Sequence, residues 1–249
     1  MFWDQPIKFA TTTATAINKR NRPDALARLS RLCLGNADSL SLALRFCSDN
    51  ESATMHTNDP FLVVGIAASA GGLAALTVIV SALPDDFPAS VLVLLHYSTD
   101  GPDLLTGILQ GHTRLRVEQA KEGALLAPAK VYVARPGWHL LVTPDGTLHL
   151  SDAPKVKHVR PAADLLFESM AGSLGRRAVA VVLTGYDSDG SGGLADIRAM
   201  GGRVIVQHPD TARVPEMPNA AIGTGQVDHV VPLEGIAPAM MVMAADCKG

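Results

Sequence analysis

From residue 61 onward, short apolar runs alternate with longer segments of helical periodicity. The runs predict strands at Leu62–Ile66, Ser90–Leu95, Val131–Ala134, His139–Thr143, Leu148–Leu150, Val179–Leu183, Arg203–Gln207 and Asp228–Val231. The periodic segments predict helices at Gly72–Ala82, Asp103–Leu109, Ala162–Leu174, Gly192–Ala199 and Ile236–Ala245. Such alternation is typical of an α/β fold: a doubly wound, mainly parallel sheet with helices on both faces.

One segment departs from this alternation. WHLLVTPDGTLHL contains two short alternating stretches joined by Pro-Asp-Gly. This pattern predicts an antiparallel β-hairpin added to the doubly wound sheet.

Residues 1 to 59 differ from the rest of the chain. They combine a Thr-rich stretch, polar segments and one predicted amphipathic helix near Asp24–Cys33, without a strand–turn–helix unit. We therefore expect a poorly ordered or loosely helical extension over residues 1–59 and a folded domain over residues 60–249.

The most informative stretch is LVVGIAASAGG, residues 62 to 72. An apolar run enters a turn of small residues that carries Ser69, and a new apolar segment follows. The pattern predicts a buried strand, a tight turn and a helix, with the serine at the carboxyl end of the strand. Reactive groups of α/β proteins occupy this position, and the helix N-terminus favours developing negative charge. Ser69 is therefore a candidate nucleophile.

Two other interpretations apply to the same stretch. Phe61 to Leu83 carries no charge and is long enough to cross a bilayer, but its glycines and the absence of basic flanks favour a strand–turn–helix. A nucleotide-binding loop would need G-x-G-x-x-G or G-x-x-x-x-G-K-[ST], and neither spacing is present.

Composition narrows the class of protein. The chain has 249 residues, of which 47% are hydrophobic and 18% charged, and its net charge is −3, which suits a globular enzyme and not a nucleic-acid-binding surface. Its 3 cysteines lie far apart without metal-ligand spacing, which indicates a reducing compartment. With no secretory signal predicted, the cytoplasm is the expected location.

Candidate partners for Ser69 follow two other predicted strands. His96 ends the strand SVLVLLH, 27 residues after Ser69 (69 to 96), which is about one β-α-β step. The loop Thr184–Gly193 carries Asp187 and Asp189 after another strand. Because parallel strands end at one edge of the sheet, a serine, an imidazole and a carboxylate can meet there, as in serine hydrolases.

Spacing alone leaves alternatives open. His208 also ends a predicted strand and competes with His96. The Asp-rich loop could be a turn in which Asp187 caps a helix, and two carboxylates without a local histidine make a poor metal site.

The motifs together resemble the catalytic domain of the chemotaxis protein-glutamate methylesterases (CheB). AASAGG at Ala67–Gly72 is similar to the family's nucleophile motif, LLHYS to its histidine motif, and LTGYDSDG at Leu183–Gly190 to its aspartate loop. The segment PEMPNAAI near residue 217 is also similar. The resemblance covers residues 61 to 245, with the motifs in the family's order.

The resemblance implies Ser69 as nucleophile, His96 as general base and acid, Asp189 as the orienting carboxylate, and the backbone N–H of Tyr186 as an oxyanion donor. It implies no metal and no organic cofactor. The implied activity is hydrolysis of glutamate methyl esters on a methylated chemoreceptor or similar signalling protein, with glutamine deamidation as a second reaction. No nucleic-acid partner and no membrane insertion are expected.

The sequence departs from the family pattern at two positions near the site. Ala67 replaces a glycine, and Asp187 replaces a common glycine. If Asp187 and Asp189 lie close together, one of the two carboxyls would have a raised pKa.

The family's usual receiver domain is not evident in residues 1–59. We therefore expect a stand-alone catalytic domain that is either constitutively active or regulated by a separate receiver-domain protein. A docking module of the same fold and an esterase for another substrate remain alternative functions.

Overall fold

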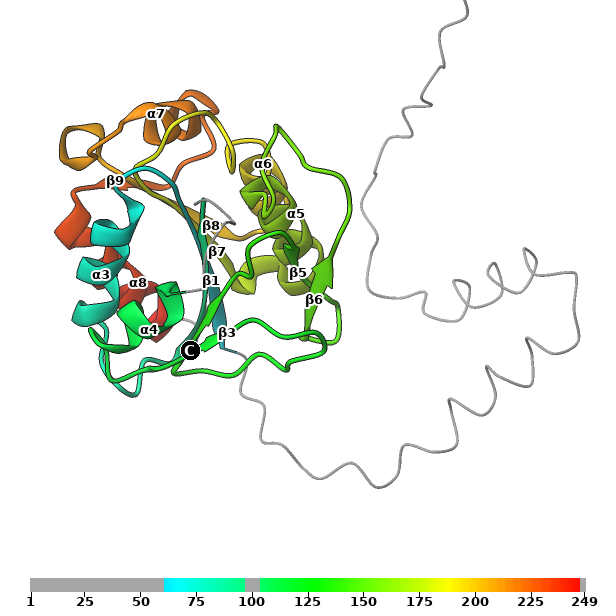
Figure 1. Ribbon diagram of the computed structural model, residues 1–249. Coiled ribbons are helices and arrows are strands. Elements are labelled where there is room, and N and C mark those ends of the chain that lie inside the picture. Colours follow the sequence, from blue (N-terminus) through cyan, green and yellow to red (C-terminus); the bar gives the residue numbers. More distant parts are fainter. Residues whose placement is uncertain (1–60, 97–103, 247–249) are drawn as a thin grey trace, which may run out of the picture. The chain divides into compact units, whose positions relative to one another are not determined.

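A computed structural model describes residues 61–96 and 104–246, and its centre is a seven-stranded parallel sheet (Figure 1). The strands follow the order β3 (Arg116–Gln119), β4 (Lys130–Val133), β2 (Ala89–Leu95), β1 (Leu62–Ala68), β7 (Ala178–Val182), β8 (Arg203–Gln207) and β9 (His229–Val231). The order reverses direction at β1, as in doubly wound folds. The predicted fold class is confirmed.

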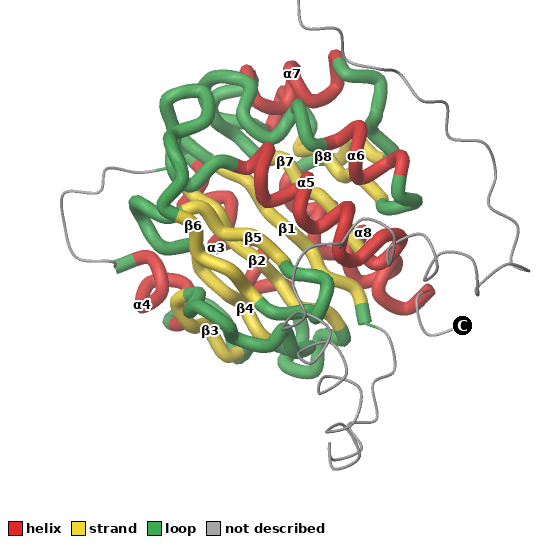
Figure 2. The backbone as a smooth tube through the Cα atoms, turned by 90° about the vertical axis from the view of Figure 1, so that its right-hand side faces the viewer, coloured by secondary structure: helices red, strands yellow, loops and turns green. Residues whose placement is uncertain are grey.

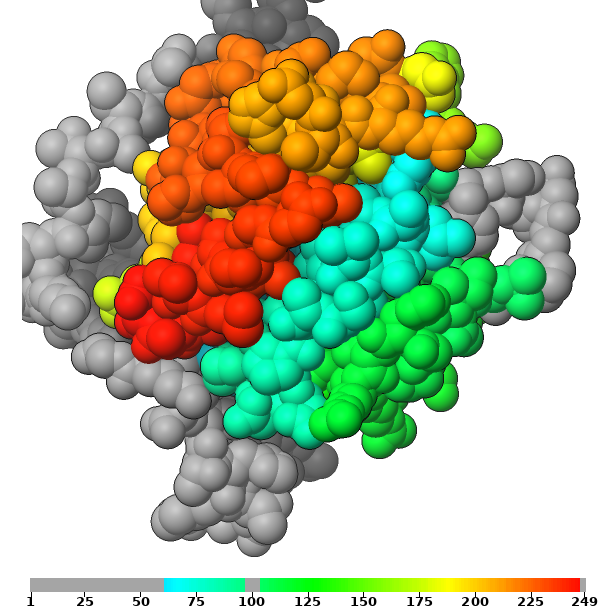
Figure 3. All heavy atoms as spheres, turned by 90° about the vertical axis from the view of Figure 1, so that its left-hand side faces the viewer, coloured from blue at the N-terminus to red at the C-terminus, as the bar shows by residue number. Residues whose placement is uncertain are grey.

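Helices cover both faces of the sheet. One face carries α3 (Gly72–Ala82), α4 (Leu105–Gln110) and α8 (Leu233–Asp246), which lie side by side on the surface in Figure 3. The other face carries α5 (Ala163–Leu174), α6 (Leu194–Ala199), α7 (Glu216–Gly223) and a hairpin of β5 (His139–Val142) and β6 (Leu148–Ser151). Two short 3-10 helices, Gly175–Arg177 and Pro209–Thr211, precede β7 and α7.

The hairpin forms a separate antiparallel sheet beside α5 (Figure 2). The hydroxyls of Ser169 and Ser173, both on α5, bond the N–H and the carbonyl of Val142 at 3.1 and 2.8 Å. The predicted hairpin is therefore confirmed, and the hydrogen bonds join it to the helix instead of to the main sheet.

Strand β1 explains why the sequence pattern is so apolar. Alternate residues of a strand point to opposite faces. Val64 and Ile66 belong to the core beneath α3 and α8, whereas Val63 and Ala67 belong to the core beneath α5 and α6. All 7 residues of β1 are buried, so the strand needs a continuous apolar run.

The segment Phe61 to Leu83 forms β1, a turn and α3, so the membrane-spanning alternative is wrong for it. None of the described helices combines the length and apolar character that crossing a bilayer requires.

Two elements were missed by the sequence prediction. Strand β3 lies at the sheet edge, where Arg116 and Glu118 form an ion pair at 3.3 Å, and such charged positions hide the apolar signal. Helix α7 begins after Pro215 and contains Pro218 in its first turn, which makes the segment read as a loop. The predicted helix Asp24–Cys33 and the extension over residues 1–59 lie outside the described residues.

Helices α5 and α6 approach closely at Gly193. A β-carbon at this position would lie 2.8 Å from the carbonyl oxygen of Asp164 and 2.8 Å from Cβ of Phe167, both fixed parts of α5. By contrast, a β-carbon at Gly172 on α5 would meet no atom within 4 Å.

We expect Gly193→Ala to lower the free energy of unfolding by about 1–3 kcal/mol, because the added methyl group must push α5 and α6 apart. Gly172→Ala is the matched control, and its better helix propensity should raise stability by roughly 0.5–1 kcal/mol. Urea denaturation measures both changes. Equal effects of the two substitutions would contradict the close packing at Gly193.

Candidate active site

Ser69 lies in the turn between β1 and α3, at the carboxyl end of the central strand. Its backbone N–H donates to Thr184 O at 3.0 Å, and its carbonyl accepts the Gly72 N–H at 2.8 Å. Gly71, with φ of 81°, lets the chain reverse into α3. Within residues 61–96 and 104–246 the Ser69 hydroxyl has no hydrogen-bond partner, which leaves it available to an external group.

His96 follows β2 beside this turn. The pair Ala68–Leu95 is the last in register between β1 and β2, and the His96 N–H donates to Ala68 O at 2.9 Å. Ser69 and His96 are therefore the next residues on two adjacent parallel strands, which lie about 4.8 Å apart. Their side chains are not hydrogen-bonded to each other in the described part of the chain.

Asp189 contacts the imidazole of His96. Oδ2 of Asp189 lies 2.9 Å from Nε2 of His96, and the two side chains are 1% and 13% exposed. The ring N–H does not point along the line between the two atoms, so the contact is a close charge interaction without ideal hydrogen-bond geometry. Since Asp189 occupies Nε2, Nδ1 is the ring nitrogen left for a second partner.

The Asp189 carboxylate also caps helix α5. Its Oδ2 accepts the Ala163 N–H at 2.6 Å, and its Oδ1 accepts the Asp164 N–H at 3.1 Å. Burial raises the pKa of Asp189, but the contact with His96 and the two helix N–H groups favour the charged form, and the net effect lowers the pKa. Asp189 is thus held as a carboxylate, and the helix dipole adds to this preference.

Asp164 holds the loop that carries Asp189. Its Oδ1 accepts the N–H groups of Gly190, Gly192 and Gly193 at 2.9, 2.8 and 3.3 Å. Its Oδ2 forms an ion pair with Lys157 at 2.7 Å. Helix α5 and the loop therefore cap each other, with one aspartate from each. Sequence reasoning missed Asp164, although its place in the first turn of a predicted helix was a signal for a capping carboxylate.

Thr184 connects the serine turn to the loop after β7, Thr184–Gly193, here called the β7 loop. Its hydroxyl donates to Ala70 O at 2.9 Å and accepts the Val214 N–H at 2.9 Å. Its own N–H donates to Oε1 of Gln207 at 2.9 Å. This buried network connects three loops at the carboxyl edge of the sheet, so it fixes the backbone on both sides of Ser69.

Gly185 allows the β7 loop to approach the nucleophile turn. A β-carbon at Gly185 would lie 2.6 Å from Cβ of Ser69 and would also overlap Met217 of α7. The next residue, Tyr186, has an exposed side chain, 61% accessible. Its backbone N–H donates no hydrogen bond to any described residue, so this donor is free beside Ser69.

Asp187 does not share the buried environment of Asp189. It is exposed, has φ of 74°, and its Oδ1 accepts the Ser188 N–H at 2.7 Å. Instead of being raised, the pKa of Asp189 is lowered. Asp187 thus forms a local turn, whereas the helix cap is Asp189.

His208, the competitor of His96, and the buried His139 have other contacts. His208 Nδ1 accepts the Asp210 N–H at 3.2 Å, at the start of a 3-10 helix. His139 is fully buried, accepts the Ala162 N–H at 3.2 Å through Nδ1, and lies 3.1 Å from Pro154 O through Nε2. These bonds give His139 a structural role at the start of α5.

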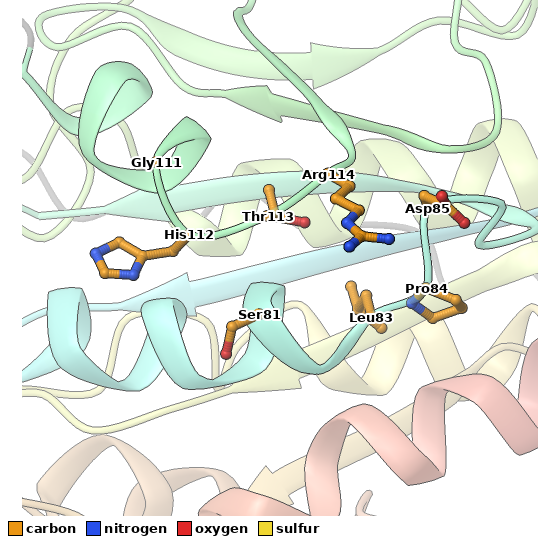
Figure 4. A pocket seen from close by; sticks show the side chains of 8 residues that line it. All are labelled: Ser81, Leu83, Pro84, Asp85, Gly111, His112, Thr113 and Arg114. Carbon is orange, nitrogen blue, oxygen red and sulfur yellow. The ribbon is translucent and has the colours of Figure 1, made fainter.

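Figure 4 shows a separate surface hollow of about 640 Å³. It is lined by Ser81, Leu83, Pro84, Asp85, Gly111, His112, Thr113 and Arg114. They lie at the C-terminal end of α3 and in the loops that lead into β2 and β3, whereas Ser69 follows the carboxyl end of β1. The hollow is therefore not part of the candidate site formed by Ser69, His96 and Asp189. Among the described residues, no group of three or more His, Cys, Asp or Glu side chains could hold a metal.

A doubly wound sheet with serine, imidazole and carboxylate at one rim is typical of hydrolytic α/β domains. The CheB methylesterase family model matches residues 64–240, and the chain belongs to this family. It is 39% identical over 188 residues to protein-glutamate methylesterase FrzG of Myxococcus xanthus, covering 76% of this chain and 56% of that protein.

Two further similarities point to the same family. A protein-glutamate methylesterase/protein-glutamine glutaminase of Rhizobium meliloti is 38% identical over 185 residues, 74% of this chain and 52% of that protein. The chain therefore spans about half the length of these curated relatives. The catalytic domain of the Thermotoga maritima CheB methylesterase superposes with a TM-score of 0.71 at 30% identity, covering 74% of this chain and 99% of that domain.

The lowered pKa of Asp189 predicts a specific pH dependence of stability. A carboxyl with a lower pKa in the folded protein stabilises the fold above its unfolded pKa, about 3.9 for aspartate. This contribution is lost as the pH falls through the folded value. At pH 6–7 we expect Asp189→Asn to lower the free energy of unfolding by about 1–3 kcal/mol. The difference from wild type should shrink only below about pH 4.

Denaturant unfolding of both proteins between about pH 3 and pH 7 measures this difference. Asp152→Asn, at an exposed position, is the matched control and should show little change at any pH. A difference that disappears between about pH 5 and pH 7 would mean that the pKa of Asp189 is raised, contrary to the geometry.

Proposed function

We propose that this chain hydrolyses glutamate methyl esters on chemoreceptor-type proteins and releases methanol. Ser69 is the nucleophile, His96 the general base and acid, and Asp189 the orienting carboxylate. The observation that carries this assignment is the 2.9 Å contact of Asp189 with His96, on the strand next to the Ser69 turn. The names of the relatives support the same reaction.

The orientation of the His96 imidazole determines which ring nitrogen accepts the Ser69 proton. Because Asp189 faces Nε2, His96 receives the Ser69 proton through Nδ1, the reverse of the usual arrangement in serine proteases. Ser69 Oγ attacks the ester carbonyl, and the backbone N–H of Tyr186 stabilises the oxyanion. The imidazolium then protonates the departing methanol, leaving a glutamyl ester on Ser69.

Water completes the cycle. His96 removes a proton from water, which attacks the acyl-enzyme; the imidazolium then returns this proton to Ser69 Oγ as the bond to the acyl group breaks and glutamate is released. Glutamine deamidation follows the same steps, with ammonia as the leaving group in place of methanol. The sparse cysteines support a cytoplasmic site of action.

We expect Ser69→Ala to abolish methanol release from a methylated chemoreceptor fragment, because the substitution removes the attacking oxygen. Ser90→Ala is a matched control, since Ser90 is fully buried in β2 and its hydroxyl has no partner among the described residues. Removing an unpaired buried hydroxyl should leave activity and stability at least equal to wild type. Methanol release and urea denaturation measure the two properties.

Substantial turnover by a folded Ser69→Ala variant would refute the nucleophile assignment. If the folded wild type released no methanol above the uncatalysed background, the result would instead favour a docking module. Release from small esters but not from the receptor fragment would indicate an esterase for another substrate.

Two replacements of His96 separate catalysis from structure. The glutamine amide nitrogen can occupy the place of Nε2 beside Asp189, whereas the shorter asparagine cannot reach it. We expect both variants to lose about 10²–10⁴-fold in kcat, because neither supplies a base. His96→Gln should keep more stability than His96→Asn. Equal stability of the two variants would argue against the Nε2 contact.

A further inference from the structure

We propose that Arg213 is a specificity-determining residue that binds a carboxylate lying close to the ester on the substrate chain. This inference rests on the proposed esterase function and defines the substrate more closely. Arg213 belongs to the loop between the 3-10 helix Pro209–Thr211 and α7.

The stem of Arg213 packs on the nucleophile turn. A β-carbon at Gly71 would lie 2.8 Å from Cβ and 3.1 Å from Cδ of Arg213. Only glycine at position 71 leaves room for this contact, and Gly71 is two residues after Ser69. The guanidinium is attached to Cδ. Its charge is therefore carried on a stem that contacts the turn of the proposed nucleophile.

The backbone on which Arg213 stands is fixed to the site. The neighbouring Val214 donates its N–H to the Thr184 hydroxyl at 2.9 Å, and its carbonyl accepts the Gly185 N–H at 3.0 Å. Thr184 in turn accepts the Ser69 N–H through its carbonyl. Arg213 thus keeps a defined position relative to Ser69, as positioning of a substrate requires.

The charge of Arg213 has no partner among the described residues. The side chain is exposed, and it forms no ion pair or hydrogen bond with any described residue. Lys157, on the loop before α5, differs in this respect, because it is paired with Asp164 at 2.7 Å. A guanidinium held at a site rim without an internal partner is suited to binding a carboxylate of an incoming chain.

The chemistry of the proposed reaction supplies this carboxylate. Each hydrolysed ester becomes a glutamate, and on a helical segment residues three or four positions apart are neighbours, with about 5–6 Å between their β-carbons. A glutamate one helical turn from the ester would reach Arg213 while the ester reaches Ser69. Hydrolysis at one position would therefore create the group that recruits the enzyme to the next.

The test uses two synthetic helical peptides with a single glutamyl methyl ester. One carries glutamates three and four residues on both sides of the ester, and the other carries alanines there. For wild type we expect a kcat/KM about three- to tenfold higher on the glutamate peptide at low salt, with the preference falling as salt rises. Arg213→Ala should remove the preference by raising KM with little change in kcat, and Arg213→Glu should reverse it.

Arg114→Ala is the matched control, because Arg114 is also exposed but lines the separate hollow shown in Figure 4. It should keep the wild-type preference. Fluorescence anisotropy of both peptides with Ser69→Ala, alone and combined with Arg213→Ala, compares dissociation constants without turnover. Tighter binding of the glutamate peptide that depends on Arg213 supports the inference even if hydrolysis fails.

A preference that persists in Arg213→Glu would overturn the inference. So would an equal loss of activity on both peptides in Arg213→Ala, which indicates a merely structural role. These results leave the esterase proposal intact as long as hydrolysis depends on Ser69. Absence of hydrolysis by wild type on both peptides and on the receptor fragment would count against the esterase proposal itself.

Discussion

The burial of one carboxylate constrains the whole rim of the sheet. Asp189 is 1% exposed, and an unpaired charge at such a position would be strongly unfavourable. Its two oxygens are satisfied by the first N–H groups of α5 and by His96 from the end of β2. Helix α5, strand β2 and the β7 loop must therefore take their positions together, and the orientation of the imidazole follows from this shared requirement.

The sheet fixes the positions of the residues that make these contacts. Its central strands are buried on both faces, so they cannot shift by one residue without moving apolar side chains into the wrong core. The serine turn is also held against the β7 loop by the hydrogen bond from Thr184 and by the close packing of Gly185. A reactive hydroxyl is thus placed on a short, tightly bound turn, which suits chemistry that depends on sub-ångström alignment.

The sequence predicted the parts of the fold that are governed by local pattern. Apolar strands and small-residue turns located Ser69 and His96 at one edge, because parallel strands share the direction of their ends. The aspartate loop was located, but the divergent orientations of Asp187 and Asp189 depend on helix α5, which begins 26 residues before Asp189 (163 to 189). Charged edge positions hid β3, and prolines hid α7. The role of Asp164 arises only from tertiary contacts that no periodicity encodes.

The mutual capping of α5 and the β7 loop links reactivity to the completion of folding. Asp189 receives its N–H donors from a helix start that is distant in sequence, and Asp164 returns the contact to Gly190 and Gly192. Without α5 docked, Asp189 lacks its helix N–H donors and Asp164 lacks the N–H groups of the loop, so the contact of Asp189 with His96 loses its support. On the proposed mechanism, a molecule in which α5 is not docked would carry an ordinary serine, and docking of α5 would complete the activation of the nucleophile.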